Sequence, residues 1–208
     1  MPVGGRMSPG VTFERIYREL KRQLRDGVLA PGAPVEPAVI GHELGASITP
    51  VRDALHRLTG EQLVETPQHN GFRVPRLTEM ELRDLYAWNG LVIGVATSRA
   101  KVDMVRDIRP PEDAETIAGR TAAMFLRIAA ATGSGENLRA VGQLNDRLAP
   151  FRRAEQQVLD GLAEELEEMT GLAAAIGRTR LNRALARYHQ RRTTETPRIL
   201  AATLNAHA

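Results

Sequence analysis

The sequence LGASITPVRDALHRL, residues 44–58, sets the fold of the first part of the chain. Ser47 and Thr49 are residue types that cap the start of a helix. Beyond them, apolar residues recur at the spacing of three and four that buries one side of a helix. We therefore predict a helix from Ser47 or Thr49 to about Gln62, with Arg52 on its exposed side and these residues on its buried side: Val51, Ala54, Leu55 and Leu58.

Two further helices are predicted upstream of this stretch. Residues 11–26 carry apolar side chains at helical spacing, and Gly27 follows as a C-cap. A short second helix is predicted over residues 37–44, where Pro37 suits the first turn. Between the two helices, the Pro31-Gly32 pair marks a tight turn.

Downstream lie two short β-prone pieces, residues 63–66 and 72–74. They flank Asn70-Gly71, a strong signal for a hairpin turn. Three helices followed by a hairpin is the order of a winged helix-turn-helix. We predict this domain over residues 11–77 and a flexible tail over residues 1–10.

The remainder of the chain, residues 78–208, has helical patterning almost throughout. Thr78 and Glu81 have the spacing of a capping box at the start of its first helix. The predicted fold is mainly α: an N-terminal winged helix-turn-helix with a small β-hairpin, followed by an all-helical bundle. The helices of the bundle are predicted at residues 79–104, 112–131, 138–148, 151–170 and 179–192, and a short tail helix is possible beyond them.

Composition excludes several classes of function. The net charge is only +3, so charge alone does not indicate nucleic-acid binding. The absence of cysteine excludes disulfides, thiolate metal sites and a cysteine nucleophile. No apolar run is long enough to span a membrane, and no enzyme motif is found. We expect a cytoplasmic protein that is not an enzyme.

Residues 44–58 resemble the DNA-recognition region of GntR-family regulators. The resemblance extends upstream to Ile16-Tyr17 and downstream through residues 63–65 and 70–74, so it covers about 65 residues at matching spacing. The helical remainder resembles the FCD subgroup, the FadR-like branch of the family. The resemblance implies a bacterial, sequence-specific transcription regulator. It would bind double-stranded operator DNA as a homodimer and respond to a small-molecule effector held in its helical domain.

The physics of the recognition helix agrees with that implication. The start of a helix offers free N–H groups and a partial positive charge to a phosphate. An exposed arginine can pair with guanine O6 and N7 in the major groove, and a glycine at the hairpin tip lets the wing backbone approach DNA. Arg57 suits a phosphate contact or a salt bridge better than base reading. The predicted DNA-binding residues are Ser47, Thr49, Pro50, Arg52, Arg57, Asn70, Gly71 and Arg73.

Two positions depart from the family pattern. Ile48 stands where family members commonly carry arginine, and Ala38 stands where many carry a basic residue. Fewer phosphate contacts mean weaker binding with a shallower dependence on salt. Ile48 is able instead to touch a thymine methyl group. These departures keep a second interpretation open, in which the winged helix is a protein-interaction module with weak or no effector response.

FCD domains usually bind a metal through one aspartate and three histidines. In this sequence Ala122, Leu126 and Leu166 occupy three of those positions, and only His189 matches. A lone histidine cannot hold a divalent ion, which needs several ligands in fixed geometry. We expect no metal and no cofactor.

The predicted effector site differs from that of the subgroup as well. Asn89 and Ile93 replace an arginine and a glutamate that are often found four residues apart. The replacements favour an effector that is larger, more apolar or absent. One hypothesis is a metal-free cavity, and the other, equally favoured, is ordinary packed core. The cavity would be lined by Trp88, Asn89, Met124, Leu126 and His189.

Overall fold

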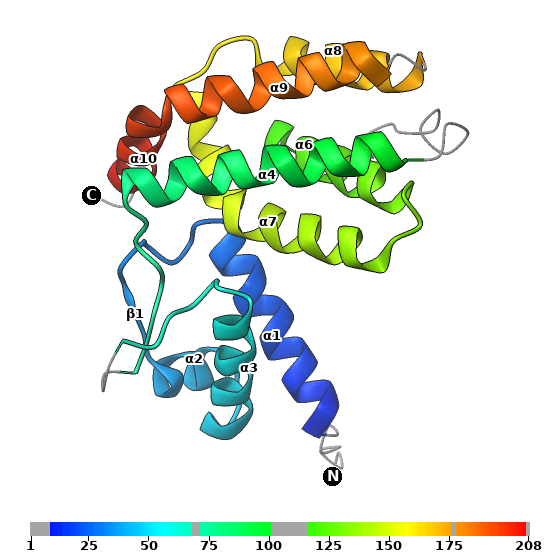
Figure 1. Ribbon diagram of the computed structural model, residues 1–208. Coiled ribbons are helices and arrows are strands. Elements are labelled where there is room, and N and C mark those ends of the chain that lie inside the picture. Colours follow the sequence, from blue (N-terminus) through cyan, green and yellow to red (C-terminus); the bar gives the residue numbers. More distant parts are fainter. Residues whose placement is uncertain (1–8, 68–70, 101–115, 176–177, 207–208) are drawn as a thin grey trace. The chain divides into compact units, whose positions relative to one another are not determined.

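The computed structural model describes residues 9–67, 71–100, 116–175 and 178–206 (Figure 1). The chain divides into two compact units, residues 1–76 and residues 77–208. Each unit buries its own cluster of apolar side chains. The fold is mainly helical with a small antiparallel sheet, which confirms the predicted fold class.

Three helices build the first unit: α1 (Pro9–Arg25), α2 (Pro37–Glu43) and α3 (Ile48–Gly60). Because α1 begins at Pro9, its first turn includes the last two residues of the predicted tail, whose other residues lie outside the described ranges. The apolar faces of α1 and α3 meet in one core, as their helical spacing predicted. Its fully buried members are Ile16, Leu20, Val51, Ala54, Leu55 and Leu58.

The sheet of this unit is wider than the predicted hairpin. Strand β1 (Pro34–Val35) pairs with β2 (Phe72–Arg73) in antiparallel fashion. On the other side of β2, Glu65 and Arg73 exchange two backbone hydrogen bonds of 2.8 and 2.9 Å. The predicted hairpin is therefore reduced to one bridge, and β1 adds a strand that the sequence did not predict.

Strand β1 was not predicted because the residues around it carry a turn signal. Gly32 has a left-handed φ of +82°, which the tight turn requires and which glycine adopts at no steric cost. After this turn the chain runs beside Val74, whose carbonyl accepts from the Gly32 N–H at 2.9 Å. Pro34 has no N–H and is confined to strand edges, so the segment carries little strand signal.

The second unit begins with the long helix α4 (Glu79–Arg99). The predicted capping box is confirmed: the Thr78 hydroxyl accepts from the Glu81 N–H, and the Glu81 carboxylate accepts from the Thr78 N–H at 2.7 Å. The predicted end of this helix at Met104 and the predicted start of the next helix at residue 112 lie outside the described ranges.

Two of the later helix predictions are wrong in their bounds. The sequence predicts a kink or a new helix start at Pro150, but helix α7 runs through this residue, and Leu148 and Phe151 on either side of it are both buried in the core. Gly161, with a left-handed φ of +67°, then sets the start of the following helix. The remaining elements are α6 (Ile117–Ala130), α7 (Gly135–Ala154), the 3-10 helix η1 (Glu155–Gln157), α8 (Leu162–Ala174), α9 (Arg178–Thr194) and α10 (Thr196–Asn205).

Helix α4 occupies the centre of this unit. It runs alongside α9 and also packs on α6, α7 and α10 (Figure 1). As a result α4 can present polar side chains to several neighbours inside the bundle. Among the described residues, no helix is both long and apolar enough to cross a membrane.

Candidate DNA-binding site and candidate effector site

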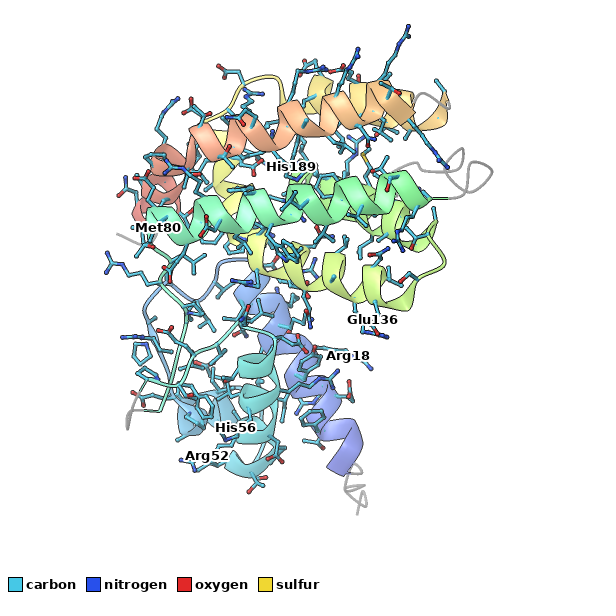
Figure 2. The ribbon with its side chains drawn as sticks, viewed as in Figure 1. Arg18, Arg52, His56, Met80, Glu136 and His189 are labelled. Atoms are coloured by element: carbon cyan, nitrogen blue, oxygen red, sulfur yellow. The ribbon has the colours of Figure 1, made fainter. Side chains whose placement is uncertain are left out.

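The outer face of α3 carries a row of exposed side chains. Arg52 and His56 lie on this face, one helical turn apart, while Ala54 and Leu55 point into the core (Figure 2). Ile48 at the start of the helix is 49% exposed. This face is exposed, as a recognition helix must be to enter a major groove.

The start of α3 differs from the expected cap. Ser47 occupies the N-cap position with extended backbone, but its side chain makes no capping hydrogen bond. Thr49 lies inside the first turn and is not the cap. The first-turn N–H groups have no helical acceptor. The exposed Ser47 hydroxyl and these N–H groups are therefore available to a phosphate.

The two arginines of α3 have different surroundings. Arg52 is exposed and forms no ion pair within the described part of the chain. Arg57 turns toward α1, where its guanidinium carbon lies 4.0 Å from the Tyr17 ring centroid and Nη1 lies 3.2 Å from a Glu14 oxygen. Arg57 therefore links α3 to α1. Of the two arginines, only Arg52 is exposed on the outer face without an ion pair among the described residues.

The wing is joined to the recognition helix by an aromatic contact. The His56 ring meets the Phe72 ring edge to face, with 5.0 Å between centroids. The sequence did not predict a role for either ring, although His56 follows Arg52 by one turn. Arg73 on β2 pairs with Glu65 at 2.7 Å, and Gly71 has a left-handed φ of +68°. The predicted contact residue Asn70 lies outside the described ranges.

A second group of polar side chains is buried inside the helical unit. Asn89 on α4 lies 2.9 Å from His189 Nε2 and 3.4 Å from Arg152 Nη2, both through its Oδ1 atom. Arg152 Nη1 donates to Asn145 Oδ1 at 2.7 Å. Asn145 in turn donates to the Ala122 carbonyl at 2.9 Å. Figure 2 shows His189 where α9 faces α4. This arrangement brings α4, α6, α7 and α9 together around polar atoms.

An ion-pair network lies next to this group. Arg192 Nη2 is 3.0 Å from Glu155 and 2.7 Å from Glu165, and its guanidinium carbon lies 3.5 Å from the Tyr188 ring centroid. The Tyr86 hydroxyl donates to Glu155 at 2.7 Å. Burial and the nearby Glu155 carboxylate raise the pKa of Tyr86 well above its usual value, so it stays a donor.

Burial holds His189 in its neutral form. Loss of solvent lowers the pKa of His189 to about 4, and the charges of Arg152 and Arg192 push in the same direction. The Leu185 carbonyl, 2.7 Å from Nδ1, opposes this effect without cancelling it.

The structure places the predicted effector residues differently. Asn89, Met124 and His189 are buried, and Leu126 is half-buried beside the same core. Trp88, however, is 55% exposed. The prediction for Trp88 is therefore wrong, because each helical step turns the side chain by about 100° and Trp88 points away when Asn89 points inward.

The residues around His189 do not fit the metal that the FCD resemblance implies. Ala122, Leu126 and Leu166 offer no ligand atoms in their side chains, and the charged neighbour is the guanidinium of Arg152, which repels a cation. Across the described ranges, no group of three or more histidine and carboxylate residues has the arrangement of a metal site.

The first unit has the helix and strand order of a winged helix-turn-helix, an architecture typical of DNA-binding transcription regulators. Residues 12–74 match the family described as bacterial regulatory proteins, gntR family. The HTH-type transcriptional regulator McbR of Escherichia coli (strain K12) is 28% identical over 91% of this chain and 84% of that protein. YdhC of Bacillus subtilis (strain 168), an uncharacterized HTH-type transcriptional regulator, is 22% identical over 88% of this chain and 80% of that protein. The comparisons therefore support a transcription regulator that carries a GntR-family domain at residues 12–74.

Two solved structures share the fold over nearly the whole chain. That of E. coli McbR/YncC has a TM-score of 0.67 at 21% identity and covers 90% of this chain and 97% of that one. The structure of a GntR transcriptional regulator from Rhodococcus sp. RHA1 has a TM-score of 0.73 at 17% identity, and the match covers 89% of this chain and 97% of that one.

Proposed function

We propose that this regulator binds a two-fold symmetric operator in double-stranded DNA as a homodimer, with α3 in the major groove. The observation that carries the proposal is Arg52, an exposed cation with no ion pair in the described part of the chain, on the outer face of α3. Its guanidinium can read a guanine edge, while Ser47, Thr49 and the N–H groups beside Pro50 bind phosphate. Gly71 and Arg73 place the wing beside the same groove, and the protein acts in the cytoplasm without a catalytic step.

The surface of α4 supports the homodimer. Four of its large apolar side chains are exposed, and we call them the α4 stripe: Met80, Trp88, Leu91 and Val95. Leu91 is 64% exposed, at a position where a monomer gains nothing from an apolar residue. Apolar side chains repeated along one face of a helix favour burial against a second copy.

The buried polar group supports an effector role for the helical unit, which we propose to be of the FCD type. Arg152 Nε and the Tyr188 hydroxyl have no hydrogen-bond partner among the described residues. Buried donors are almost always paired, so two unpaired ones in one bundle favour a site that a ligand completes.

The test is binding to a genomic DNA library at two salt concentrations. Wild type is expected to select a two-fold sequence. Arg52→Ala should lose about 1–3 kcal/mol of binding free energy at one position of each half-site. Arg198→Ala removes the same charge from an exposed position on α10 and serves as the matched control. If wild type selects no sequence and Arg52→Ala loses nothing, the exposed α3 face is a protein-interaction surface and the proposal fails.

A further inference from the structure

Ile48 is a large apolar side chain that the core of the first unit does not include. It is the first residue of α3, and it is 49% exposed. Its apolar neighbours along the chain, Leu44 and Ala46, pack partly buried against the core of this unit, whereas Ile48 is not among the described members of that core. Single exposed apolar residues are common on protein surfaces, so its position decides whether it has a role.

Ile48 begins a row of side chains along the outer face of α3. Ile48, Arg52 and His56 follow one another at intervals of four residues, and all three are exposed. Residues four apart lie one above the other on the same side of a helix. Val51 and Leu55, between them, are buried, and Figure 2 shows Arg52 and His56 on the side that faces away from the core. Ile48 therefore shares a face with the arginine that the proposed function places in the major groove.

An isoleucine in this row suits a base better than a phosphate. Ile48 carries no charge and no donor in its side chain, and Pro50, in the same first turn, has no N–H to offer. An apolar side chain pressed against a phosphate would remove water from a charged group without replacing its hydrogen bonds, which costs free energy. The favourable partner of Ile48 is therefore an apolar group on the edge of a base.

The major groove offers one methyl group to such a side chain. Base edges there present hydrogen-bond donors and acceptors, and only thymine adds a methyl group, at C5. Arg52, one turn along the helix, suits the two acceptors of guanine. Successive base pairs are about 3.4 Å apart and four residues of helix span about 6 Å, so the two contacts fall one or two base pairs apart.

We infer that Ile48 determines sequence specificity: it packs against a thymine methyl group one or two base pairs from the guanine that Arg52 reads. This inference rests on the proposed function, because it needs α3 in the major groove. The recognised feature is the methyl group and not the base pair as a whole. Uracil, which pairs as thymine does but lacks that methyl group, is therefore bound less tightly at this position.

The experiment is a thermodynamic cycle between a change in the protein and a change in the DNA. The full chain selects its operator from a genomic library, and each thymine of one half-site, on both strands, is then replaced in turn by deoxyuridine. The guanine is located with Arg52→Ala, which should no longer respond when a guanine analogue that lacks N7 takes its place. Near that guanine, we expect one replacement by uracil to weaken wild-type binding about fourfold, the effect of one buried methyl group. Ile48→Ala should bind the thymine and uracil duplexes equally at that position.

Two further variants sharpen the cycle. Ile48→Val keeps a branched apolar side chain, so it should retain most of the discrimination, and it covers the case in which the alanine variant binds too weakly to measure. Leu138→Ala shortens an apolar side chain that is 41% exposed on α7 and should respond to uracil as wild type does. A uracil effect of equal size in wild type and Ile48→Ala, or no uracil effect within two base pairs of the guanine, overturns the inference and leaves the regulator proposal standing. If wild type selects no sequence at all, both fail.

Discussion

The ring of His56, on the recognition helix, meets the ring of Phe72, on the wing strand, edge to face at 5.0 Å between centroids. His56 comes from the exposed side of α3, whereas Phe72 is 7% exposed and belongs to the core of the first unit. The contact therefore fixes the wing against the outer face of α3. Both parts of a winged helix must hold their positions to contact one DNA site together.

Breaking this contact should loosen the wing. We predict that His56→Ala costs about 0.5–1.5 kcal/mol of unfolding free energy, the range of an aromatic pair. A double-mutant cycle with Phe72→Leu measures the coupling in denaturant. Because Phe72 also fills the core, the single Phe72→Leu variant should cost more than His56→Ala. Additive effects would mean that the two rings lie close without stabilising each other.

A cation added at the start of α3 should strengthen DNA binding. Ile48 is 49% exposed, and an arginine there would add one cation to the first turn of the recognition helix. We predict that Ile48→Arg binds nonspecific DNA more tightly and steepens the slope of log K against log salt by about one unit. The comparison variant is Leu138→Arg, whose position on α7 is also exposed and lies in the other unit. Equal slopes in the two variants would place the first turn of α3 away from phosphate.

The α4 stripe gives a prediction about assembly. Leu91→Glu places a charge in the centre of the proposed dimer surface and should shift the protein toward monomer in sedimentation at micromolar concentration. Glu167→Gln, on the exposed side of α8, changes one charge elsewhere and should leave the oligomer unchanged. Weaker operator binding should accompany the loss of the dimer, because two half-sites no longer reinforce each other. A wild type that is already monomeric would contradict the proposal.

The sequence predicted the features whose interacting residues lie close together along the chain, and it did not predict those whose partners are far apart. The capping box at Thr78 and Glu81 and the buried side of α3 are set within one or two helical turns, and local spacing predicted both. Strand β1 depends on pairing with β2, nearly forty residues later, so its two residues carried only a turn signal.

The buried charges were not predicted for the same reason. Arg152 stands among polar residues that look like a solvated surface, and its contact with Asn89 spans 63 residues of sequence. Trp88 was misplaced because α4 has apolar residues on all sides, so periodicity cannot tell which face is buried. Only tertiary packing decides between Trp88 and Asn89.

The low pKa of His189 gives a prediction about stability and pH. In the unfolded chain this imidazole titrates near 6.5, whereas in the folded chain its pKa is about 4. Between these values the unfolded state binds one more proton, so stability falls as pH falls. The contribution of His189 is complete above pH 6.5, and we expect about 3 kcal/mol to be lost at pH 4.

The measurement is the free energy of unfolding in denaturant from pH 7.5 to 4, with His189→Gln as the comparison. Glutamine keeps a polar side chain facing Leu185 and Asn89 but does not titrate. Every other titratable group is common to the two proteins, so the difference between the two curves isolates His189. That difference should be flat above pH 6.5 and grow below it. Parallel curves over the whole range would show that His189 has the same pKa in the folded and unfolded chains.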